Sequence, residues 1–207
     1  MSREKHTYLA SVNRRAWDAI GEQVASPYLD HPGYRALFEE FMARLEPGSE
    51  VLDLGCGPGI PVARMLSHRF AVTGLDFSPE MVRAARRNVL GAEFVVADMT
   101  KMQIWKRFSG VVASYSLLCL PPDKFLLAAR NICDALKLGG LCFIALNDGD
   151  GGSLVQLGTR VVYAHAYSEA DVRLAFSTLA VLDIRRDIVQ SEMFGVERSI
   201  SFLLQAS

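Results

Sequence analysis

The fold can be inferred from one stretch, Val51-Leu52-Asp53-Leu54-Gly55-Cys56-Gly57-Pro58-Gly59. In it, an apolar run that contains one acid is followed by three glycines on alternate positions. This pattern predicts a buried strand, residues 51–54, that enters a tight turn where a ligand can approach the backbone closely. We expect the rest of the chain to be arranged around the carboxyl end of this strand.

Short apolar segments alternate with segments of helical pattern beyond this turn. Such alternation predicts an α/β fold with a mostly parallel, doubly wound sheet and helices on both faces. The expected strands are 51–54, 70–75, 93–97, 111–114, 141–146, about 179–189 and 197–205, the last two as an antiparallel pair. The expected helices are 3–24, 34–45, 59–67, 79–89, 122–137 and 169–176.

Composition limits the possible classes of function. The chain has 207 residues, of which 50% are hydrophobic, and its formal net charge is −1. A single globular domain is therefore expected, and the charge argues against a nucleic-acid partner. The four cysteines form no C-x-x-C pair, and the four histidines lack metal-ligand spacing, so we expect no metal site. Reduced thiols, a charged N-terminus without an apolar leader and no apolar run of membrane-spanning length predict a cytoplasmic protein without a membrane partner.

The glycine spacing indicates what kind of ligand the turn receives. A dinucleotide fingerprint would place its third glycine at Ile60, whereas here it is Gly59. The turn also lacks the lysine followed by serine or threonine of a Walker phosphate loop. The pattern therefore favours a ligand with a nucleoside and a small zwitterion over one with a pyrophosphate.

Acids stand at or near the ends of three expected strands. Asp53 is costly to bury unless it is paired, so either a cationic amine of a ligand or neighbouring backbone N–H groups should satisfy it. Asp76 stands where an acid typically accepts both hydroxyls of a ribose. Asp98 could accept from an adenine amine between Phe77 and Met99, although Met99 is almost equally typical of plain core packing.

These segments together resemble the class I S-adenosylmethionine-dependent methyltransferases of the small-molecule type. The resemblance lies in residues 51–59, in Val72-Thr73-Gly74-Leu75-Asp76-Phe77-Ser78-Pro79-Glu80-Met81, in Val95-Val96-Ala97-Asp98-Met99 and in Leu136-Lys137-Leu138-Gly139-Gly140. It implies a Rossmann-like, seven-stranded sheet with a reversed last strand. It also implies S-adenosyl-L-methionine as cofactor and S-adenosyl-L-homocysteine as product.

The resemblance also implies which residues hold the cofactor. The glycine turn would lie against its methionine part with Asp53 nearby, Asp76 would bind the ribose, and Asp98 with Met99 the adenine. Trp17 lies in an N-terminal segment that closes over the cofactor in this family, and Ser114 would face the methionine moiety or the reacting methyl. The full expected set is Trp17, Asp53, Gly55, Cys56, Gly57, Gly59, Asp76, Phe77, Ser78, Met81, Asp98, Met99, Ser114 and Tyr115. Val24 and Cys119 depart from the family pattern, since an aromatic residue and a histidine are common at those positions.

The predicted reaction is in-line transfer of the sulfonium methyl to an O, N or S nucleophile. A general base is required only for a protonated, weakly acidic acceptor. Ser114-Tyr115-Ser116-Leu117 replaces the Asn-Pro-Pro-Tyr type of tetrad, which argues against methylation of DNA or glutamine amino groups. A small-molecule acceptor is therefore expected, with His165 and Tyr115 as candidate catalytic residues. Tyr28, Tyr163 and Tyr167 are candidate pocket residues.

We interpret the chain as one domain with three parts. These are a helical cap (1–47), a cofactor-binding core (48–146), and an acceptor-pocket segment with the C-terminal strands (147–207). The alternatives are a protein that binds S-adenosylmethionine in a regulatory role, one that uses it in another reaction such as a cyclisation, and an NAD-dependent oxidoreductase. The protein is expected to be a monomer or a homodimer.

Overall fold

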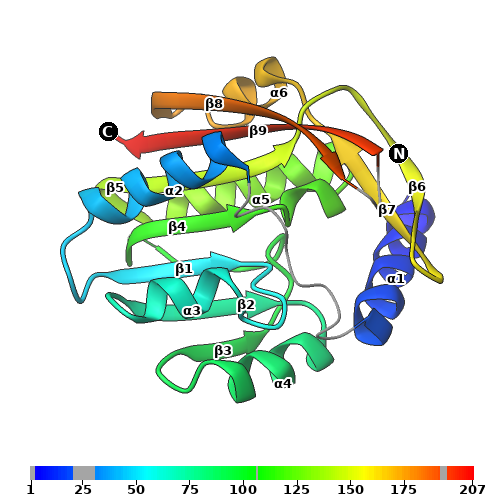
Figure 1. Cartoon of the computed structure of the whole chain (residues 1–207), viewed down its shortest axis with the longest axis horizontal. Coiled ribbons are helices and arrows are strands. Elements are labelled where there is room, and N and C mark those ends of the chain that lie inside the picture. The colour runs from blue at the N-terminus through cyan, green and yellow to red at the C-terminus, as the bar shows by residue number, and fades with distance from the viewer. Residues whose placement is uncertain (1–2, 21–30, 106, 192–194) are drawn as a thin grey trace.

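The computed structural model describes residues 3–20, 31–105, 107–191 and 195–207. Its centre is a seven-stranded sheet in the order β3-β2-β1-β4-β5-β9-β8 (Figure 1). The strands are β1 (Glu50–Leu54), β2 (Ala71–Asp76), β3 (Glu93–Val96), β4 (Phe108–Ser114), β5 (Leu136–Asn147), β8 (Leu179–Ser191) and β9 (Gly195–Ala206). Only β9 runs antiparallel to its neighbours β5 and β8, so the predicted mostly parallel sheet with a reversed last strand is confirmed.

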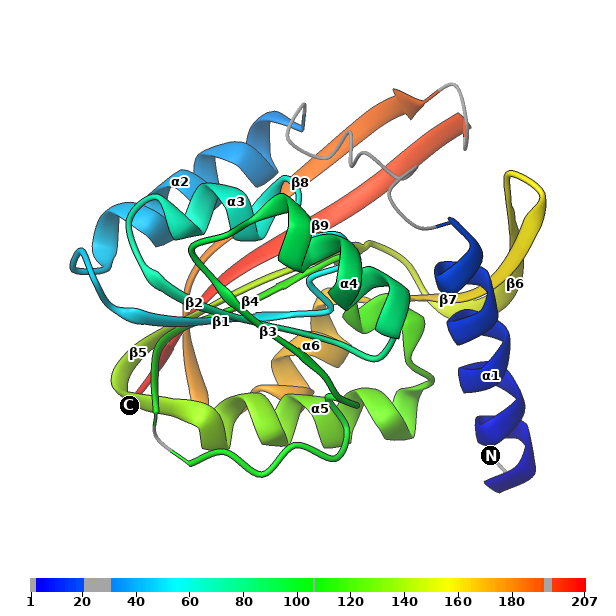
Figure 2. The same ribbon diagram turned by 90° about the horizontal axis from the view of Figure 1, so that it is seen from below.

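Helices cover both faces of the sheet (Figure 2). One face packs against α2 (Pro32–Arg44), α3 (Val62–Ser67) and α4 (Pro79–Asn88), and the other against α5 (Pro122–Ala135) and α6 (Glu169–Ala175). The apolar sides of these helices and of the strands form two buried clusters, one on each face. Helix α1 (Arg3–Ile20) lies off the sheet, beyond the carboxyl ends of the parallel strands (Figure 2).

A two-stranded hairpin was missed by the sequence analysis. Strands β6 (Gly151–Leu157) and β7 (Arg160–Ala166) pair antiparallel, and α1 packs against β7. Gly158 and Thr159 connect the two strands, and Gly158 has a φ of +57°. A two-residue connection that contains glycine, between β-branched segments, is a hairpin signal that could have revealed this element.

Three predicted boundaries are corrected. The helix expected at 59–67 begins only at Val62, since Gly59 has a φ of +77°, which is not helical. The helix expected at 122–137 ends at Ala135, because Leu136 already pairs with Phe108 as the first residue of β5. Strand β4 begins at Phe108 rather than at 111, and a short 3₁₀ helix (Leu117–Cys119) follows it. The part of the first helix expected at 21–24 lies outside the described residues.

Helix α2 is held by a capping carboxylate that is distant in sequence. Its N-cap residue His31 makes no side-chain capping bond. Instead, the Asp187 carboxylate of β8 accepts from the backbone N–H of Gly33 at 2.7 Å and of Tyr34 at 2.9 Å. Gly33 has no side chain, and a Cβ there would come 2.9 Å from Asp187 Oδ2. Asp187 thereby fixes where α2 begins relative to the C-terminal strands.

Replacing Asp187 by Ala should lower the free energy of unfolding by about 1–2 kcal/mol, since one buried and one partly buried N–H group at a helix start lose their acceptor. Asp187→Asn, which keeps one acceptor oxygen, should cost less. The measurement is urea unfolding followed by circular dichroism. Asp134→Ala is the control: Asp134 pairs with Arg130 at 3.9 Å on the surface, and its loss should change stability by less than about 0.5 kcal/mol. Equal losses in the Asp187 and Asp134 variants would contradict the capping role.

Candidate functional site

The predicted site lies at the carboxyl ends of β1, β2 and β4. Strand order reverses between β1 and β4, and ligands of such sheets bind at this switch point. The turn after β1 is built from Gly55, Gly57 and Gly59, whose φ angles are +69°, +52° and +77°. Residues that carry a side chain rarely adopt this left-handed backbone conformation. The turn therefore requires glycine at these three positions.

The glycine turn is packed against the protein at Gly55 and open at Gly57. A Cβ on Gly55 would overlap the Cβ of Ser116, which follows β4, so this glycine is required by close packing as well. A Cβ on Gly57 would meet no atom of the described residues within 4 Å. The turn therefore packs against the end of β4 through Gly55 and is open at Gly57.

The Asp76 carboxylate holds the turn. Its Oδ2 accepts from the Gly57 N–H at 3.0 Å, and its Oδ1 accepts from the Ser78 N–H at 2.9 Å. Burial raises the pKa of Asp76, and the two amides partly offset that rise. The ribose-binding role expected for Asp76 is a prediction that these contacts leave untested, but they assign the carboxylate a second task in shaping the turn.

Ser78 caps the start of α4 and also contacts α1. Its hydroxyl oxygen accepts from the Met81 N–H at 3.1 Å at the start of α4, with Pro79 in the first turn. The same hydroxyl donates to the Asp18 carboxylate of α1. Met81 is buried in the first turn of α4, so it supports this corner by packing.

Asp53 is buried beneath the glycine turn, and its carboxylate is incompletely hydrogen-bonded within the described residues. Its side chain is 2% exposed, and its Oδ2 has no hydrogen-bond partner within the described part of the chain. Burial, and then the charge of Asp76, raises the pKa of Asp53 to about 7. The alternative in which neighbouring backbone N–H groups satisfy the carboxylate does not hold for this oxygen. Ser116 Oγ, also buried, lacks a partner in the same described region.

The other residues expected around the cofactor differ in burial and in hydrogen bonding. Asp98 Oδ1 accepts from the Thr100 N–H at 2.9 Å and from its hydroxyl at 2.7 Å. Partial burial raises the pKa of Asp98, but these bonds and Lys101 outweigh it, so the pKa is below its usual value. Met99 belongs to a core cluster, as the alternative interpretation had it, and its Cε is 3.5 Å from the position of a Gly55 Cβ. Cys56 is buried, and Phe77 is partly exposed beside Asp76.

The end of β4 has an unusual backbone. Tyr115 has a φ of +51°, the one positive value for a non-glycine residue in the described ranges. Its ring stacks on Tyr34 of α2, with centroids 5.9 Å apart. The Ser114 and Tyr34 hydroxyls are 2.9 Å apart, and the Tyr115 hydroxyl lies 3.4 Å from His31 Nδ1. The sequence analysis missed His31 and Tyr34 as site residues, because nothing in the local pattern indicates a contact across some 80 positions.

Helix α1 is fixed beside the site by a buried amide. Asn13 Nδ2 donates to the carbonyl oxygens of Cys119 and Tyr163, both at 3.1 Å, and Asn13 Oδ1 accepts from the Tyr163 N–H at 2.7 Å. The Trp17 side chain lies beside the Cys119 thiol. Burial raises the pKa of Cys119 to about 12, so this thiol cannot serve as a base near neutrality. Val24 and Tyr28 lie outside the described residues.

His165 lies on β7 between two polar aromatic residues, Tyr163 on the same strand and Tyr167 directly after it. Its Nδ1 is 3.0 Å from the Tyr163 hydroxyl, and its ring centroid is 4.4 Å from that of Tyr167. Burial lowers the pKa of His165, while Asp150 and Asp171 oppose that shift, so the imidazole is neutral at pH 7. Tyr167 donates its hydroxyl to the Leu120 carbonyl at 2.7 Å and stacks on Phe125, which makes it a core residue rather than a pocket residue.

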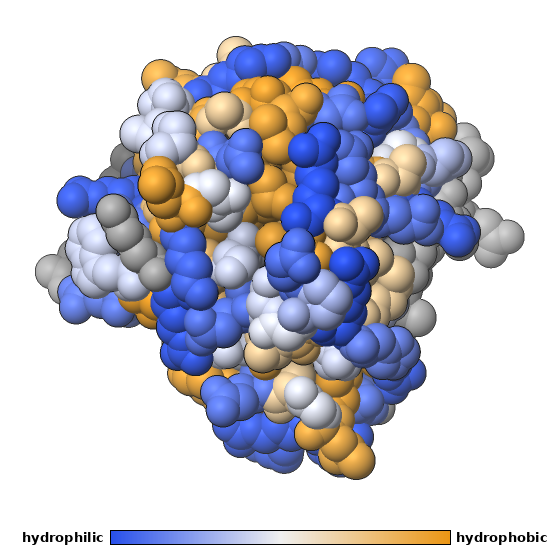
Figure 3. Space-filling view, turned by 90° about the vertical axis from the view of Figure 1, so that its left-hand side faces the viewer, coloured by the Kyte–Doolittle hydropathy of each residue, from blue (hydrophilic) through white to orange (hydrophobic). Residues whose placement is uncertain are grey.

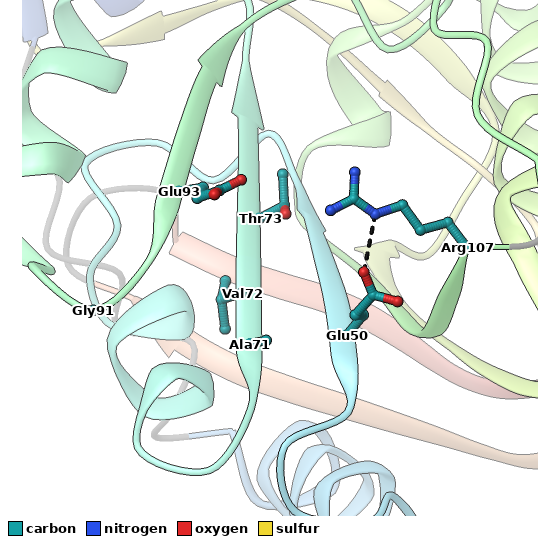
Figure 4. Close-up of a pocket in the computed structure, with 7 residues that line it drawn as sticks. All are labelled: Glu50, Ala71, Val72, Thr73, Gly91, Glu93 and Arg107. Atoms are coloured by element: carbon teal, nitrogen blue, oxygen red, sulfur yellow. Dashed lines mark hydrogen bonds and ion pairs between the residues drawn. The ribbon is translucent and has the colours of Figure 1, made fainter.

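A polar hollow of about 260 Å³ lies at the opposite edge of the sheet (Figure 4). It is lined by Glu50, Ala71, Val72, Thr73, Gly91, Glu93 and Arg107. Glu50 and Arg107 face each other there at 3.0 Å. The surface at the amino ends of the strands is largely hydrophilic with hydrophobic patches (Figure 3). None of the predicted site residues lines this hollow.

Comparison with known proteins identifies the core. Residues 51–140 match the family model described as a methyltransferase domain. This segment is therefore similar to methyltransferase domains. A trans-aconitate 2-methyltransferase of Enterobacter sp. (strain 638) is 32% identical over 132 residues, covering 62% of this chain and 52% of that protein. A ubiquinone biosynthesis O-methyltransferase of Xanthomonas axonopodis pv. citri (strain 306) is 39% identical over 82 residues, covering 39% of this chain and 33% of that protein.

Solved structures resemble the chain in fold. The Burkholderia thailandensis 1,6-didemethyltoxoflavin-N1-methyltransferase was solved with 1,6-didemethyltoxoflavin and S-adenosylhomocysteine bound. It superposes with a TM-score of 0.73 at 21% identity, over 98% of this chain and 90% of that one. This likeness establishes a shared fold. The curated relatives are longer, since the matched regions span about half of the first and a third of the second.

Within the described parts of the chain, no three His, Cys, Asp or Glu side chains group as metal ligands would. Among the same residues, none of the helices combines the length and apolar character needed to cross a membrane.

Asp53 predicts a measurable pH dependence of stability. The pKa of Asp53 in the folded protein, about 7, exceeds that of an unfolded aspartate. The contribution of this group to the free energy of unfolding is therefore fully present below about pH 4 and is lost as pH rises toward 7. The wild type should therefore lose stability relative to Asp53→Asn over this interval, by at most about 4 kcal/mol. The measurement is urea unfolding at several pH values. Asp134→Asn, on the surface, should keep the wild-type profile, and parallel profiles for wild type and Asp53→Asn would contradict the assignment.

Proposed function

We propose that this protein transfers a methyl group from S-adenosyl-L-methionine to a small-molecule acceptor. The observation that carries the proposal is the unsatisfied Asp53 Oδ2 buried under a glycine turn that is open at Gly57. An orphaned carboxylate oxygen needs a donor, and the ammonium group of the cofactor's methionine part is one. The match of residues 51–140 to a methyltransferase domain supports the same ligand.

The residues present fit this cofactor. The glycine turn would lie against the methionine part, Asp53 would receive its amine, and Asp76 and Asp98 would face ribose and adenine. Phe77, Met99, Ser114 and Trp17 complete the proposed walls. The bound cofactor supplies an activated sulfonium methyl. The chain then has to exclude water and align the acceptor, a contribution that can be large without a covalent catalyst.

We propose that α1, the start of α2 and the β6–β7 hairpin together form the acceptor pocket. Asn13 joins α1 to β7 and to the 3₁₀ turn after β4, and His31 before α2 lies 3.4 Å from the Tyr115 hydroxyl beyond the same strand. Relatives named for trans-aconitate and for ubiquinone biosynthesis favour a small molecule over a macromolecule. All four cysteines are free thiols, which agrees with the proposed cytoplasmic location.

Calorimetry with three ligands tests the cofactor. S-Adenosylmethionine and S-adenosylhomocysteine should bind, and NAD should not. Asp76→Ala should weaken S-adenosylhomocysteine binding at least about tenfold, because the Gly57 and Ser78 amides lose their shared acceptor. Glu80→Ala, at an exposed position in the first turn of α4, should stay within about twofold of wild type. NAD binding without S-adenosylmethionine binding would favour the oxidoreductase alternative.

Transfer itself is tested with methyl-labelled cofactor and a metabolite extract. Label should appear in a small molecule. Tight cofactor binding without any transfer would favour a regulatory protein or another reaction such as a cyclisation.

His165→Ala tests the base on β7. If the neutral imidazole beside Tyr163 accepts the acceptor's proton, turnover should fall by about 10²-fold or more while S-adenosylhomocysteine affinity survives. His68→Ala, at an exposed position after α3, is the control. Unchanged turnover would remove His165 from the mechanism.

A further inference from the structure

A second polar cluster joins three elements on the other side of the β4 end. His31 precedes α2 and is 3% exposed. Its Nδ1 lies 3.4 Å from the Tyr115 hydroxyl beyond β4 and 3.4 Å from the Ser199 hydroxyl on β9. The two rings meet edge to face, with centroids 6.5 Å apart. One imidazole nitrogen is thus presented to two hydroxyl groups.

The cluster is held by contacts that do not involve His31 itself. Asp187 accepts from the Gly33 and Tyr34 N–H groups and so fixes the residues that follow His31. Tyr34 stacks on the Tyr115 ring, and its hydroxyl lies 2.9 Å from Ser114 Oγ. The Tyr115 ring is thus held by Tyr34, and its hydroxyl lies against His31.

A buried histidine between two hydroxyls can be purely structural. Two further features distinguish this one. Tyr115 has a positive φ, a conformation that costs about 1–3 kcal/mol and is typical of functional positions. It also follows Ser114 at the switch point, directly beyond the strand end where the methyl is expected. Packing alone would require an aromatic ring at this position but not a hydroxyl aimed at an imidazole.

We propose that Tyr115 and His31 form a proton relay, and that the acceptor is consequently a weakly acidic hydroxyl compound of the phenol class. This inference rests on the proposed methyl transfer. The acceptor hydroxyl gives its proton to the Tyr115 oxygen as the Tyr115 proton moves to His31 Nδ1. The acceptor oxygen forms the new bond to the methyl carbon, and the electron pair of the broken carbon–sulfur bond stays on sulfur, which leaves S-adenosylhomocysteine. Tyr115 is the catalytic residue here and His31 a positioning residue that acts through it.

The relay selects the acceptor class by acidity. A carboxylic acid is already ionised near neutrality and needs no base, whereas a phenol, with a pKa near 10, must lose its proton as it reacts. A built proton acceptor beside the reacting position is of use only for the second kind of nucleophile.

The test uses the full chain, methyl-labelled S-adenosylmethionine and two probes, catechol as the phenol and trans-aconitate as the carboxylate. Label should enter catechol. Tyr115→Phe and His31→Gln should each lower kcat for catechol by about 10²-fold or more. KM for catechol and the affinity for S-adenosylhomocysteine should change by less than about threefold. The double variant should be no slower than the slower single variant, because the two groups act in one relay.

Matched controls separate the relay from structural damage. Tyr8→Phe on the exposed face of α1 and His68→Gln after α3 should retain wild-type kcat. Tyr115→Phe removes one oxygen and keeps the ring that stacks on Tyr34, so it remains informative if His31→Gln fails to fold.

Several outcomes would overturn the relay. They are transfer to trans-aconitate in preference to catechol, transfer to neither, additive losses in the double variant, and wild-type kcat in Tyr115→Phe. Calorimetry distinguishes this failure from that of the proposed function. If S-adenosylmethionine does not bind, the methyltransferase proposal fails, and if it binds while catechol remains unlabelled, only the relay fails.

Discussion

The hydrogen bonds of the Asp76 carboxylate tie together the parts of the site that come from different places in the chain. One oxygen holds the Gly57 amide of the turn after β1, and the other holds the Ser78 amide at the start of α4. Ser78 in turn contacts Asp18 of α1. A single buried carboxylate at the end of β2 thus sets the shape of the glycine turn, the start of one helix and the approach of another.

Burying Asp53 close to Asp76 is electrostatically costly, and both pKa values are raised mainly by burial. Backbone amides donate hydrogen bonds to the buried Asp76 carboxylate, whereas Asp53 Oδ2 has no hydrogen-bond partner in the described chain. Groups that destabilise the unliganded protein in this way are typical of binding sites, where a ligand supplies the missing contact. A cationic amine would relieve the repulsion and satisfy the oxygen together.

The end of β4 lies between two sets of polar aromatic residues. On one side, Tyr163 and His165 stand on β7, which Asn13 joins to α1. On the other, Tyr115 contacts His31 at the start of α2, which Asp187 caps. Each set is anchored by one buried polar side chain from a distant element. The acceptor's proton thus has two candidate routes, His165 on β7 and the Tyr115–His31 relay, and the variants at each position decide between them.

The sequence by itself determined the alternating sheet, the glycine turn and the acids at the strand ends, because strand and helix periods and left-handed glycines are local properties. The caps that Ser78 forms at α4 and that Ser168 and Asp171 form at α6 are likewise local, because each joins residues three positions apart. Only the tertiary structure decided that Asp187 caps α2, that Asn13 bonds to β7, and that His31 meets Tyr115. Those contacts join residues 154, 150 and 84 positions apart, and no local pattern encodes such distances. These contacts arise from the order in which the strands pair. That order places α2 beside β8, and it places the end of β4 beneath the first turn of α2.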